Sequence, residues 1–326
     1  MSTLYPLRFE TIFKEKIWGG QKIKTLLNKD FSPLNNCGET WELSAVPGDV
    51  SRVANGGLAG QALNELVAKY GAELLGDRVY QTYGKEFPLL IKFLDANDDL
   101  SVQVHPGDEL AEIRHGSKGK TEMWYIIQAD EGATLITGFN QPMDKEKYKS
   151  YVDKNQVMKI LNKEPVKAGD VFFIPAGRIH TIGKGILLAE IQQTSDVTYR
   201  IYDFDRQDAM GNYRELHNEQ AVDAIDYDQY DTYRTEYKEK RNESTTMVAS
   251  KYFETHKLVL DQPTTRDYSG LDSFVIYISI SGEGVLRYGH NHEEPIRQGE
   301  VYLVPACLDE IVIEPAGELN LLEVWV

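Results

Sequence analysis

The chain has 326 residues, with 35 Lys and Arg against 51 Asp and Glu, which gives a formal net charge of −16 at pH 7. The hydrophobic fraction of 41% and the charged fraction of 26% are those of a globular protein, not a disordered one. This acidity argues against binding of nucleic acid or of an anionic membrane, because both need a basic surface. A small anionic substrate is compatible with it, since a few Lys and Arg side chains can form a local positive pocket.

The sequence carries no signal for a membrane or for export. No apolar run approaches the ~20 residues that a bilayer-spanning helix needs, and the first residues, MSTLYPLRFETIFKEK, lack the apolar core of a signal peptide. The two cysteines, Cys37 and Cys307, are interpreted as reduced thiols rather than as a disulfide. We therefore expect a cytoplasmic protein.

Short apolar runs bounded by Gly, Pro, Asn or Asp dominate the chain and predict β-strands. Helical periodicity is confined to a few segments between them. In chain order, the sequence predicts a helix over 61–75, strands over 88–94 and 123–128, a helix over 144–161, strands over 171–175 and 186–191, a short helix over 217–225, and strands over 274–280, 301–305 and 319–326. Many short strands separated by turns favour a sandwich or a barrel.

An internal repeat indicates two similar β-units. Residues 125–135 resemble 277–286, and residues 169–176 resemble 299–306, in the same order within each half. An internal sequence repeat of this kind predicts two similar barrels in one chain.

The expected boundary lies near residue 245. Residues 1–245 would form a metal-binding domain with helical insertions, and residues 246–326 a second, degenerate domain. The polar, Tyr-rich segment 226–245 is either a linker or a segment whose tyrosines pack on a neighbouring domain.

The strongest local motif is Gly169-x5-Pro175-x-Gly177-x2-His180. A Gly-Asp turn leads into an apolar strand, and Pro175 and Gly177 then bend the chain at the strand end. This motif resembles the second motif of the cupin superfamily. The resemblance implies a mainly β fold with cupin-type jelly-roll barrels.

The first motif of that superfamily normally supplies His-x-His and then a Glu on the next strand, and Gln103 with His105 resembles the first part and Glu122 the second. The resemblance implies that these three residues join His180. Gln103 and His105 are two positions apart on a predicted strand, so they share a face with each other, and Glu122 begins the next apolar run. Two imidazoles, a carboxylate and an amide oxygen converging from three strands would suit a borderline divalent ion such as Zn²⁺. Gln103 could instead support the ligands from outside the coordination sphere.

The second unit lacks these residue types at the matching positions. Cys307 replaces the second glycine of the motif, and Glu310 replaces its histidine. We therefore expect the second unit to have no metal site.

Several segments together resemble the type I mannose-6-phosphate isomerases, and in particular their short bacterial form. They are 100–106 (LSVQVHP), 120–123 (KTEM), 190 with 197–200 (E, then VTYR), 17–20 (IWGG), 38–44 (GETWELS), 54–56 (ANG) and 214–217 (RELH). The resemblance covers nearly the whole chain. It implies a zinc-dependent aldose–ketose isomerase, with one zinc per chain, that interconverts mannose 6-phosphate and fructose 6-phosphate.

The same resemblance implies roles for individual residues. The metal ligands would be Gln103, His105, Glu122 and His180; the catalytic residues Arg200, Lys120 and Glu190; and the phosphate contacts Ser101 and Lys92.

Such an isomerase moves a proton between C1 and C2 through an enediolate, so negative charge develops on a former carbonyl oxygen. Arg200 would stabilise that charge because arginine rarely loses its proton. The proton-transferring base is left open among Glu190, Lys120 and a metal-bound water. Beside zinc and Arg200, the pKa of Lys120 would be lowered, which would suit it to this role.

Structural alternatives exist for two of these residues. Arg200 could be a surface residue paired with Asp203 or Asp205, and Lys92 could belong to a buried ion pair.

Alternative functions are another metal-dependent cupin, such as a decarboxylase or a dioxygenase, and a sugar-phosphate-binding cupin without turnover. The former usually present three histidines and one glutamate, so Gln103 argues against them. The sequence makes no prediction of the oligomeric state.

Overall fold

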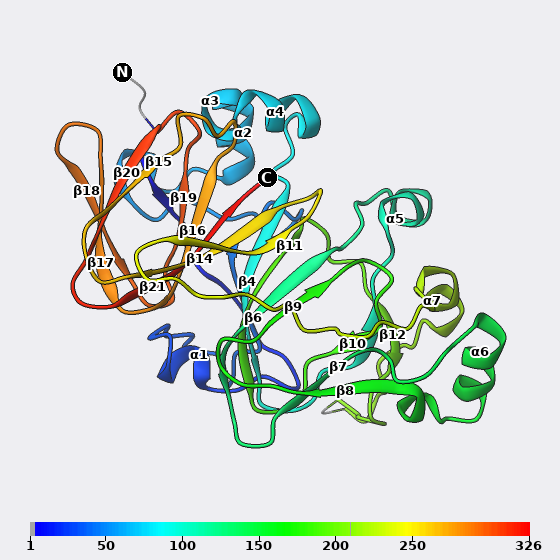
Figure 1. Ribbon diagram of the computed structural model, residues 1–326. Helices are drawn as coiled ribbons and strands as arrows, with labels where there is room; N and C mark the ends of the chain where they lie inside the picture. Colours follow the sequence, from blue (N-terminus) through cyan, green and yellow to red (C-terminus); the bar gives the residue numbers. More distant parts are fainter. Residues whose placement is uncertain (1–3, 209) are drawn as a thin grey trace.

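The computed structural model describes residues 4–208 and 210–326 of the chain. It is mainly β, with four antiparallel sheets arranged as two pairs and short helices at the periphery (Figure 1). Within these residues, no helix is both long and apolar enough to cross a bilayer. Cys37 and Cys307 do not form a disulfide with each other.

The first pair of sheets contains the residues singled out above. One sheet has the order β2 (Ile12–Lys14), β3 (Glu39–Leu43), β4 (Leu89–Ala96), β11 (Ile186–Gln193), β6 (Glu122–Ala129) and β9 (Val171–Ile174). The other has the order β12 (Tyr199–Tyr202), β5 (Val102–Val104), β10 (His180–Thr181), β7 (Thr134–Phe139) and β8 (Leu161–Pro165).

The second pair is built almost wholly from the last third of the chain. One sheet has the order β1 (Leu7–Arg8), β19 (Val301–Val304), β16 (Val275–Ser281), β21 (Leu319–Trp325), β14 (Glu254–Leu260) and β13 (Ser244–Ala249), and the other β15 (Thr264–Asp267), β20 (Glu310–Pro315), β17 (Glu283–Tyr288) and β18 (His292–Arg297). Strand β1 pairs with β19 although it lies near the amino terminus. The division at residue 245 stays a prediction. Strand β1 lies before that position in the chain but belongs to a sheet of the second pair.

The helices interrupt the strands as insertions. They are α1 (Lys22–Thr25), α2 (Leu63–Tyr70), α3 (Ala72–Leu75), α4 (Asp77–Tyr83), α5 (Asp108–His115), α6 (Lys145–Asp153) and α7 (Asn218–Ala224), with 3₁₀ turns η1 (Gly56–Leu58) and η2 (Val157–Ile160). The helix predicted over 61–75 is broken at Gly71, where φ is +48°, a backbone conformation that glycine adopts without strain. The helix predicted over 144–161 ends at Asp153, and the helix predicted over 217–225 is present as α7.

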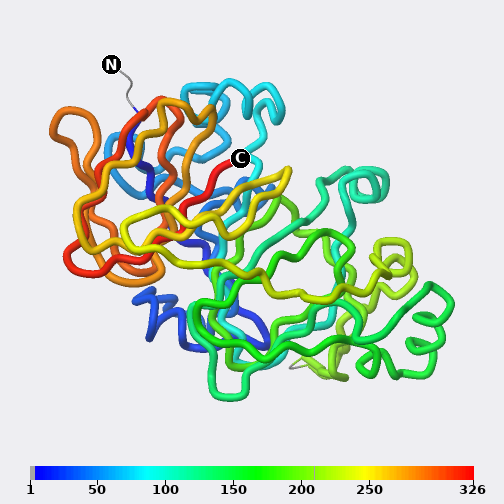
Figure 2. Tube along the Cα trace, viewed as in Figure 1, coloured from blue at the N-terminus to red at the C-terminus, as the bar shows by residue number. Residues whose placement is uncertain are grey.

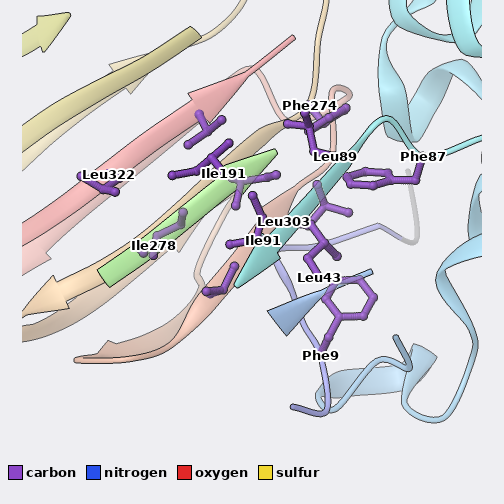
Figure 3. Packing of buried hydrophobic residues seen from close by; sticks show 14 of the residues in the cluster. Phe9, Leu43, Phe87, Leu89, Ile91, Ile191, Phe274, Ile278, Leu303 and Leu322 are labelled. Atoms are coloured by element: carbon purple, nitrogen blue, oxygen red, sulfur yellow. The ribbon is translucent and has the colours of Figure 1, made fainter. Parts of the chain in front are cut away.

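The two pairs of sheets pack against each other through a continuous apolar layer. Alternate residues of β4 and β11, among them Leu89, Ile91 and Ile191, contact Ile278 and Leu322 of the second pair (Figure 3). Strand side chains alternate between faces, so the intervening residues of β4 and β11 point into the first unit. Both faces of these strands are thus buried, which explains why their sequences are nearly continuously apolar.

The Tyr-rich segment 226–245 packs on the first unit on its way from α7 to β13 (Figure 2). The Tyr233 hydroxyl donates a hydrogen bond to the carbonyl of Phe139 at 3.0 Å, and its ring covers Gly138 so closely that a Cβ there would lie 2.3 Å away. The Tyr237 hydroxyl donates to the carbonyl of Gly169 at 2.8 Å. The tyrosines of this segment thus pack on the first unit itself.

A lysine lies within the apolar layer between the units. Lys257 is 1% exposed, and its ammonium donates to the Tyr125 hydroxyl at 3.0 Å. Burial lowers the pKa of Lys257 from 10.5 to about 8, against the opposing influence of Glu239 and Glu318. Between these two pH values the unfolded chain binds more protons here than the folded chain, so this site makes the free energy of unfolding rise with pH.

The variant Lys257→Met should therefore be more stable than the parent chain at pH 7, by about 1–3 kcal/mol, because it removes a buried ammonium. It should also lose the rise in stability above pH 8. Urea unfolding from pH 7 to 10 measures both effects. Lys251→Met, at a lysine whose side chain is 75% exposed, is the matched control. A less stable Lys257→Met chain at pH 7 would contradict the prediction.

Candidate active site

Strand pairing brings the predicted site residues into two facing rows. In one sheet, Gln103 on β5 lies opposite His180 on β10 and opposite Arg200 on β12. In the other, Glu190 on β11 lies opposite Lys92 on β4. Of these residues, Gln103, Arg200, Glu190 and Lys92 line one pocket of about 360 Å³ between the two sheets. The walls of that pocket include Lys16, Trp18, Glu39, Trp41, Lys92, Ser101, Gln103, Lys120, Glu190, Asp196, Thr198, Arg200 and Arg214.

Three potential metal ligands meet next to this pocket. His105, Glu122 and His180 are buried, and their ligating atoms all lie within 4.8 Å of one another. The Nε2 atoms of His105 and His180 are 3.5 and 3.4 Å from the two oxygens of Glu122. The amide nitrogen of Gln103 is 3.2 Å from His180 Nε2, so this side chain also reaches the group.

Backbone carbonyls orient both imidazoles. The Nδ1 atom of His105 lies 2.9 Å from the carbonyl of Val197, and Nδ1 of His180 lies 2.8 Å from the carbonyl of Arg178. A nitrogen that faces a carbonyl carries the proton, which leaves the lone pair on Nε2 directed at Glu122. Burial lowers the pKa of His180 to about 3 and that of His105 well below 6.5. Both rings are therefore neutral, as metal binding requires.

Glu122 is the residue that most needs a cation. Both of its carboxylate oxygens are buried and accept no well-aligned hydrogen bond, although the Lys120 ammonium lies 2.9 Å from Oε2. Burial, together with the nearby charge of Glu190, raises the pKa of Glu122 to about 7. A buried carboxylate without hydrogen bonds is costly unless it is paired or binds a metal. Together with two neutral imidazoles, it fits a divalent metal ion.

A network of charged groups continues from the metal ligands. The Lys120 ammonium is 3.1 Å from His105 Nε2 and 3.9 Å from Oε1 of Glu190. Burial would lower the pKa of Lys120, but Glu122 and Glu190 outweigh it and raise the pKa. Two carboxylates facing the ammonium thus raise the pKa of Lys120 in the metal-free site, and a lowered pKa beside a bound zinc stays a prediction.

The carboxylate of Glu190 lies close to Lys92, Trp124 and Lys120. Oε1 accepts from Lys92 at 3.2 Å, and Oε2 accepts from the Trp124 indole at 2.9 Å. Burial would raise the pKa of Glu190, but Lys120 and Lys92 outweigh it and hold the pKa below its usual value. Lys92 is also 3.9 Å from Glu39, so it has the buried ion-pair partners that the sequence left open as an alternative to phosphate.

Arg200 lies at the pocket with unused donors. Its Nη1 donates to the carbonyl of Glu215 at 2.8 Å, while its Nε is buried without a partner. Asp203 pairs with Arg206 and Arg214 instead of with Arg200. Burial and these two arginines lower the pKa of Arg200. The alternative in which Asp203 neutralises Arg200 is therefore not what the structure shows.

The structure also adds pocket residues that the sequence interpretation did not assign to the site. Glu39 and Trp41 alternate on β3, and Thr198 alternates with Arg200, so each pair points into the pocket. Thr198 could have been found from its spacing to Arg200. Nothing in the local sequence distinguishes Lys16 or Asp196, which reach the pocket from loops.

Comparison with known proteins agrees with this geometry. The family description "Phosphomannose isomerase type I, catalytic domain" matches residues 7–142. The chain is 38% identical over 322 residues to mannose-6-phosphate isomerase ManA of Bacillus subtilis (strain 168), covering 97% of this chain and 98% of that protein. It is 38% identical over 301 residues to mannose-6-phosphate isomerase of Streptococcus mutans, covering 92% of each.

A solved structure extends the similarity to the whole fold. The crystal structure of the mannose 6-phosphate isomerase from Bacillus subtilis superimposes with a TM-score of 0.88 at 34% identity, covering 98% of this chain and 99% of that one. The predicted mainly β, cupin-type fold is confirmed by this match. Sequence identity over nearly the full length, together with this fold, shows that the chain belongs to the type I mannose-6-phosphate isomerases.

Proposed function

We propose that the protein is a zinc-dependent aldose–ketose isomerase that interconverts mannose 6-phosphate and fructose 6-phosphate through an enediolate. The observation that carries the proposal is the buried group of His105, Glu122 and His180 beside a pocket that holds Arg200 and Lys120. The names of the relatives supply the substrate pair.

The donor set suits zinc, which catalytic sites bind through two His and one Glu. His105 and His180 would bind through Nε2, Glu122 through a carboxylate oxygen, and Gln103 through its amide oxygen. One ion per chain follows, because His105, Glu122 and His180 form one group. When bound, the metal would supply Lewis acidity toward the sugar's carbonyl and hydroxyl oxygens.

The chain's own residues would handle the developing charge and the proton. Arg200 lines the pocket, where its guanidinium would stabilise the charge on an enediolate oxygen. Glu190 and Lys120, 3.9 Å apart, give an acid and a base within reach of adjacent carbons. The group that removes the proton is one of three: Glu190, Lys120 or a metal-bound water. Lys92 and the Trp124 indole hold Glu190 in one orientation, which limits where it can act.

The pocket also fits the size and charge of the substrate. A volume of about 360 Å³ is in the range of small-molecule sites, and Lys16, Lys92, Lys120 and Arg200 line it in a chain of net charge −16. We assign the phosphate to Ser101 and Lys92. Phosphate would then share Lys92 with Glu190, so binding should weaken that ion pair.

The alternative is a sugar-phosphate-binding protein of the same fold without turnover. A coupled assay on mannose 6-phosphate distinguishes the two. The metal-loaded chain should produce fructose 6-phosphate, chelation should abolish the activity, and Zn²⁺ should restore it. Failure of the zinc-loaded chain to isomerise would disprove the isomerase proposal. Recovery with Mn²⁺ or Fe²⁺ and not with Zn²⁺ would disprove the zinc assignment alone.

A cytoplasmic location stays a prediction from the sequence signals and the two thiols. The absence of nucleic-acid or membrane partners stays a prediction from the acidic composition. The sugar phosphate is the one partner that the proposal requires.

A further inference from the structure

A chain of hydrogen bonds runs from the second unit into the backbone beside the substrate pocket. It begins at Tyr252, a half-buried residue in the turn between β13 and β14, and that turn reaches the start of α5 (Figure 1). The Tyr252 hydroxyl donates to Oδ2 of Asp108 at 2.6 Å. Asp108 is the first residue of α5 and follows the proposed metal ligand His105 by three positions. The second unit is thus hydrogen bonded to a segment that begins at a metal ligand.

Gln193, the last residue of β11, is the next member of this chain. Its amide nitrogen donates to Oδ1 of Asp108 at 3.0 Å, and its amide oxygen accepts from the backbone N–H of Thr121 at 2.9 Å. The backbone N–H of Gln193 also donates to the carbonyl of Thr121 at 3.1 Å. A carboxylate can only accept and a backbone N–H can only donate, so these two partners fix the orientation of the amide.

Thr121 lies between two residues of the proposed site, Lys120 and Glu122. Successive side chains of an extended chain point to opposite sides, so Lys120 and Glu122 share one side and Thr121 faces the other. The Lys120 ammonium accordingly lies 2.9 Å from Oε2 of Glu122. Thr121 is buried, and its N–H and carbonyl both bind Gln193, so the backbone position of Thr121 sets the positions of both neighbours.

The hydroxyl of Thr121 connects the same backbone to the segment before His180. It accepts from the N–H of Ala176 at 3.2 Å, within the bend that leads to His180. In that bend, the N–H of Gly177 donates to the carbonyl of His105 at 2.9 Å. Hydrogen bonds around Thr121 therefore join the three segments that present the histidine and carboxylate ligands.

The distances within the site leave little room for movement. The Lys120 ammonium is 3.1 Å from Nε2 of His105 and 3.9 Å from Oε1 of Glu190. A displacement of ~1 Å in such a site can lower a rate by ~100-fold. Gln193 lies on the face of β11 opposite to Glu190, and Ile191 of that face packs against the second unit (Figure 3). In the part of the chain that the structure describes, the second unit contributes no side chain to the pocket, so its influence on the reaction would pass through such contacts.

We propose that Gln193 is a positioning residue for the reaction. Held through Asp108 by Tyr252 of the second unit, it fixes the backbone of Thr121 and thereby the place of Lys120 beside the metal ligands. The proposal rests on the proposed function for its effect on the rate, whereas its effect on the geometry of the metal site is measurable without turnover. It also gives the second unit, whose sequence predicts no metal site, a part in ordering the first.

The principal test is Gln193→Leu, which removes both side-chain hydrogen bonds at nearly the same volume. In the coupled assay at saturating Zn²⁺, we expect kcat to fall at least ~10-fold with KM changed by less than ~2-fold, because the substrate contacts remain while Lys120 is displaced. The visible absorption spectrum of the Co²⁺-loaded variant, which reports on ligand geometry, should also differ from that of the Co²⁺-loaded parent chain. Glu122, a proposed ligand, directly follows Thr121 and would move with it.

Tyr252→Phe is the second variant and the milder one, since it removes a single hydroxyl from a half-buried ring. It should lower kcat by ~3–10-fold, the equivalent of one hydrogen bond. Adding Tyr252→Phe to Gln193→Leu should cause no further loss, because the hydroxyl acts through the amide. Asp108→Asn keeps an acceptor for Gln193 and a partner for Tyr252, so it should keep most of the parent kcat, whereas Asp108→Ala should lose it as Gln193→Leu does.

Tyr302→Phe is the matched control, because it removes a hydroxyl that donates to the carbonyl of Pro295 within the second unit at 2.7 Å. It should leave kcat and the Co²⁺ spectrum unchanged. Urea unfolding of every variant identifies a role in stability alone: the proposal is wrong if Gln193→Leu loses stability but keeps the parent kcat and the parent Co²⁺ spectrum. Additive losses in the double variant would also contradict it. A parent chain without isomerase activity would refute the proposed function instead, and the Co²⁺ spectra would then decide whether Gln193 orders the metal site.

Discussion

Replacing His180 with alanine should abolish isomerisation and metal binding together. The Nε2 of this residue is 3.4 Å from Glu122, and its ring is held by the carbonyl of Arg178, so no neighbouring group can take its place. Loss of an outer hydrogen-bond partner already costs ~10–100-fold in metal affinity, and loss of a ligand should cost more. Metal analysis of the purified variant and the coupled assay measure the two effects in one sample.

His290→Ala is the matched control for this prediction. His290 is exposed in the turn between β17 and β18. Both strands belong to a sheet of the second pair, which contains none of the proposed metal ligands. It should retain full activity and a full complement of metal. If His180→Ala kept its metal at parent stoichiometry, the ligand assignment would be wrong even if the activity had disappeared.

Arg200→Ala should have the second largest effect, and it should separate catalysis from metal binding. Arg200 contacts no proposed metal ligand through its side chain in the structure, and it lines the pocket. Removing one preorganised donor to an oxyanion costs ~10²–10³-fold in kcat. We expect a loss of that order, with metal content unchanged and with a smaller effect on KM than on kcat.

Arg200→Lys tests whether charge alone is sufficient. A lysine keeps the positive charge but is a point donor, so it should recover little of the lost rate. Loss of metal in Arg200→Ala would contradict the assignment, since it would mean that the arginine supports the ligands. A raised KM with an unchanged kcat would instead identify Arg200 as a binding residue.

Much of the metal site could be predicted from the sequence because it depends on local geometry. Gln103 and His105 share a face of one strand by the two-residue period of β-structure, and the Gly-Pro-Gly spacing places His180 at a strand end. Lys92 within an apolar run likewise indicated a buried charge that needs a partner. These inferences need only the strand and its direction.

The partners of the charged residues could not be predicted in the same way. Lys92 meets Glu190 because β4 and β11 are neighbours, although 98 positions separate them in the chain. Asp203 lies nearer to Arg200 in sequence than any other acidic residue, yet it pairs with Arg206 and Arg214. Ion pairs of this kind follow strand order and loop paths, which local patterns do not encode.

The sequence by itself thus determined the mainly β architecture and the residues able to bind a metal, because strand periodicity and motif spacing act over a few positions. The tertiary structure alone decided which sheet faces pack between the units and which carboxylates pair with the lysines of the pocket. The physical reason is that burial and charge pairing depend on distances between strands that only the folded chain brings together.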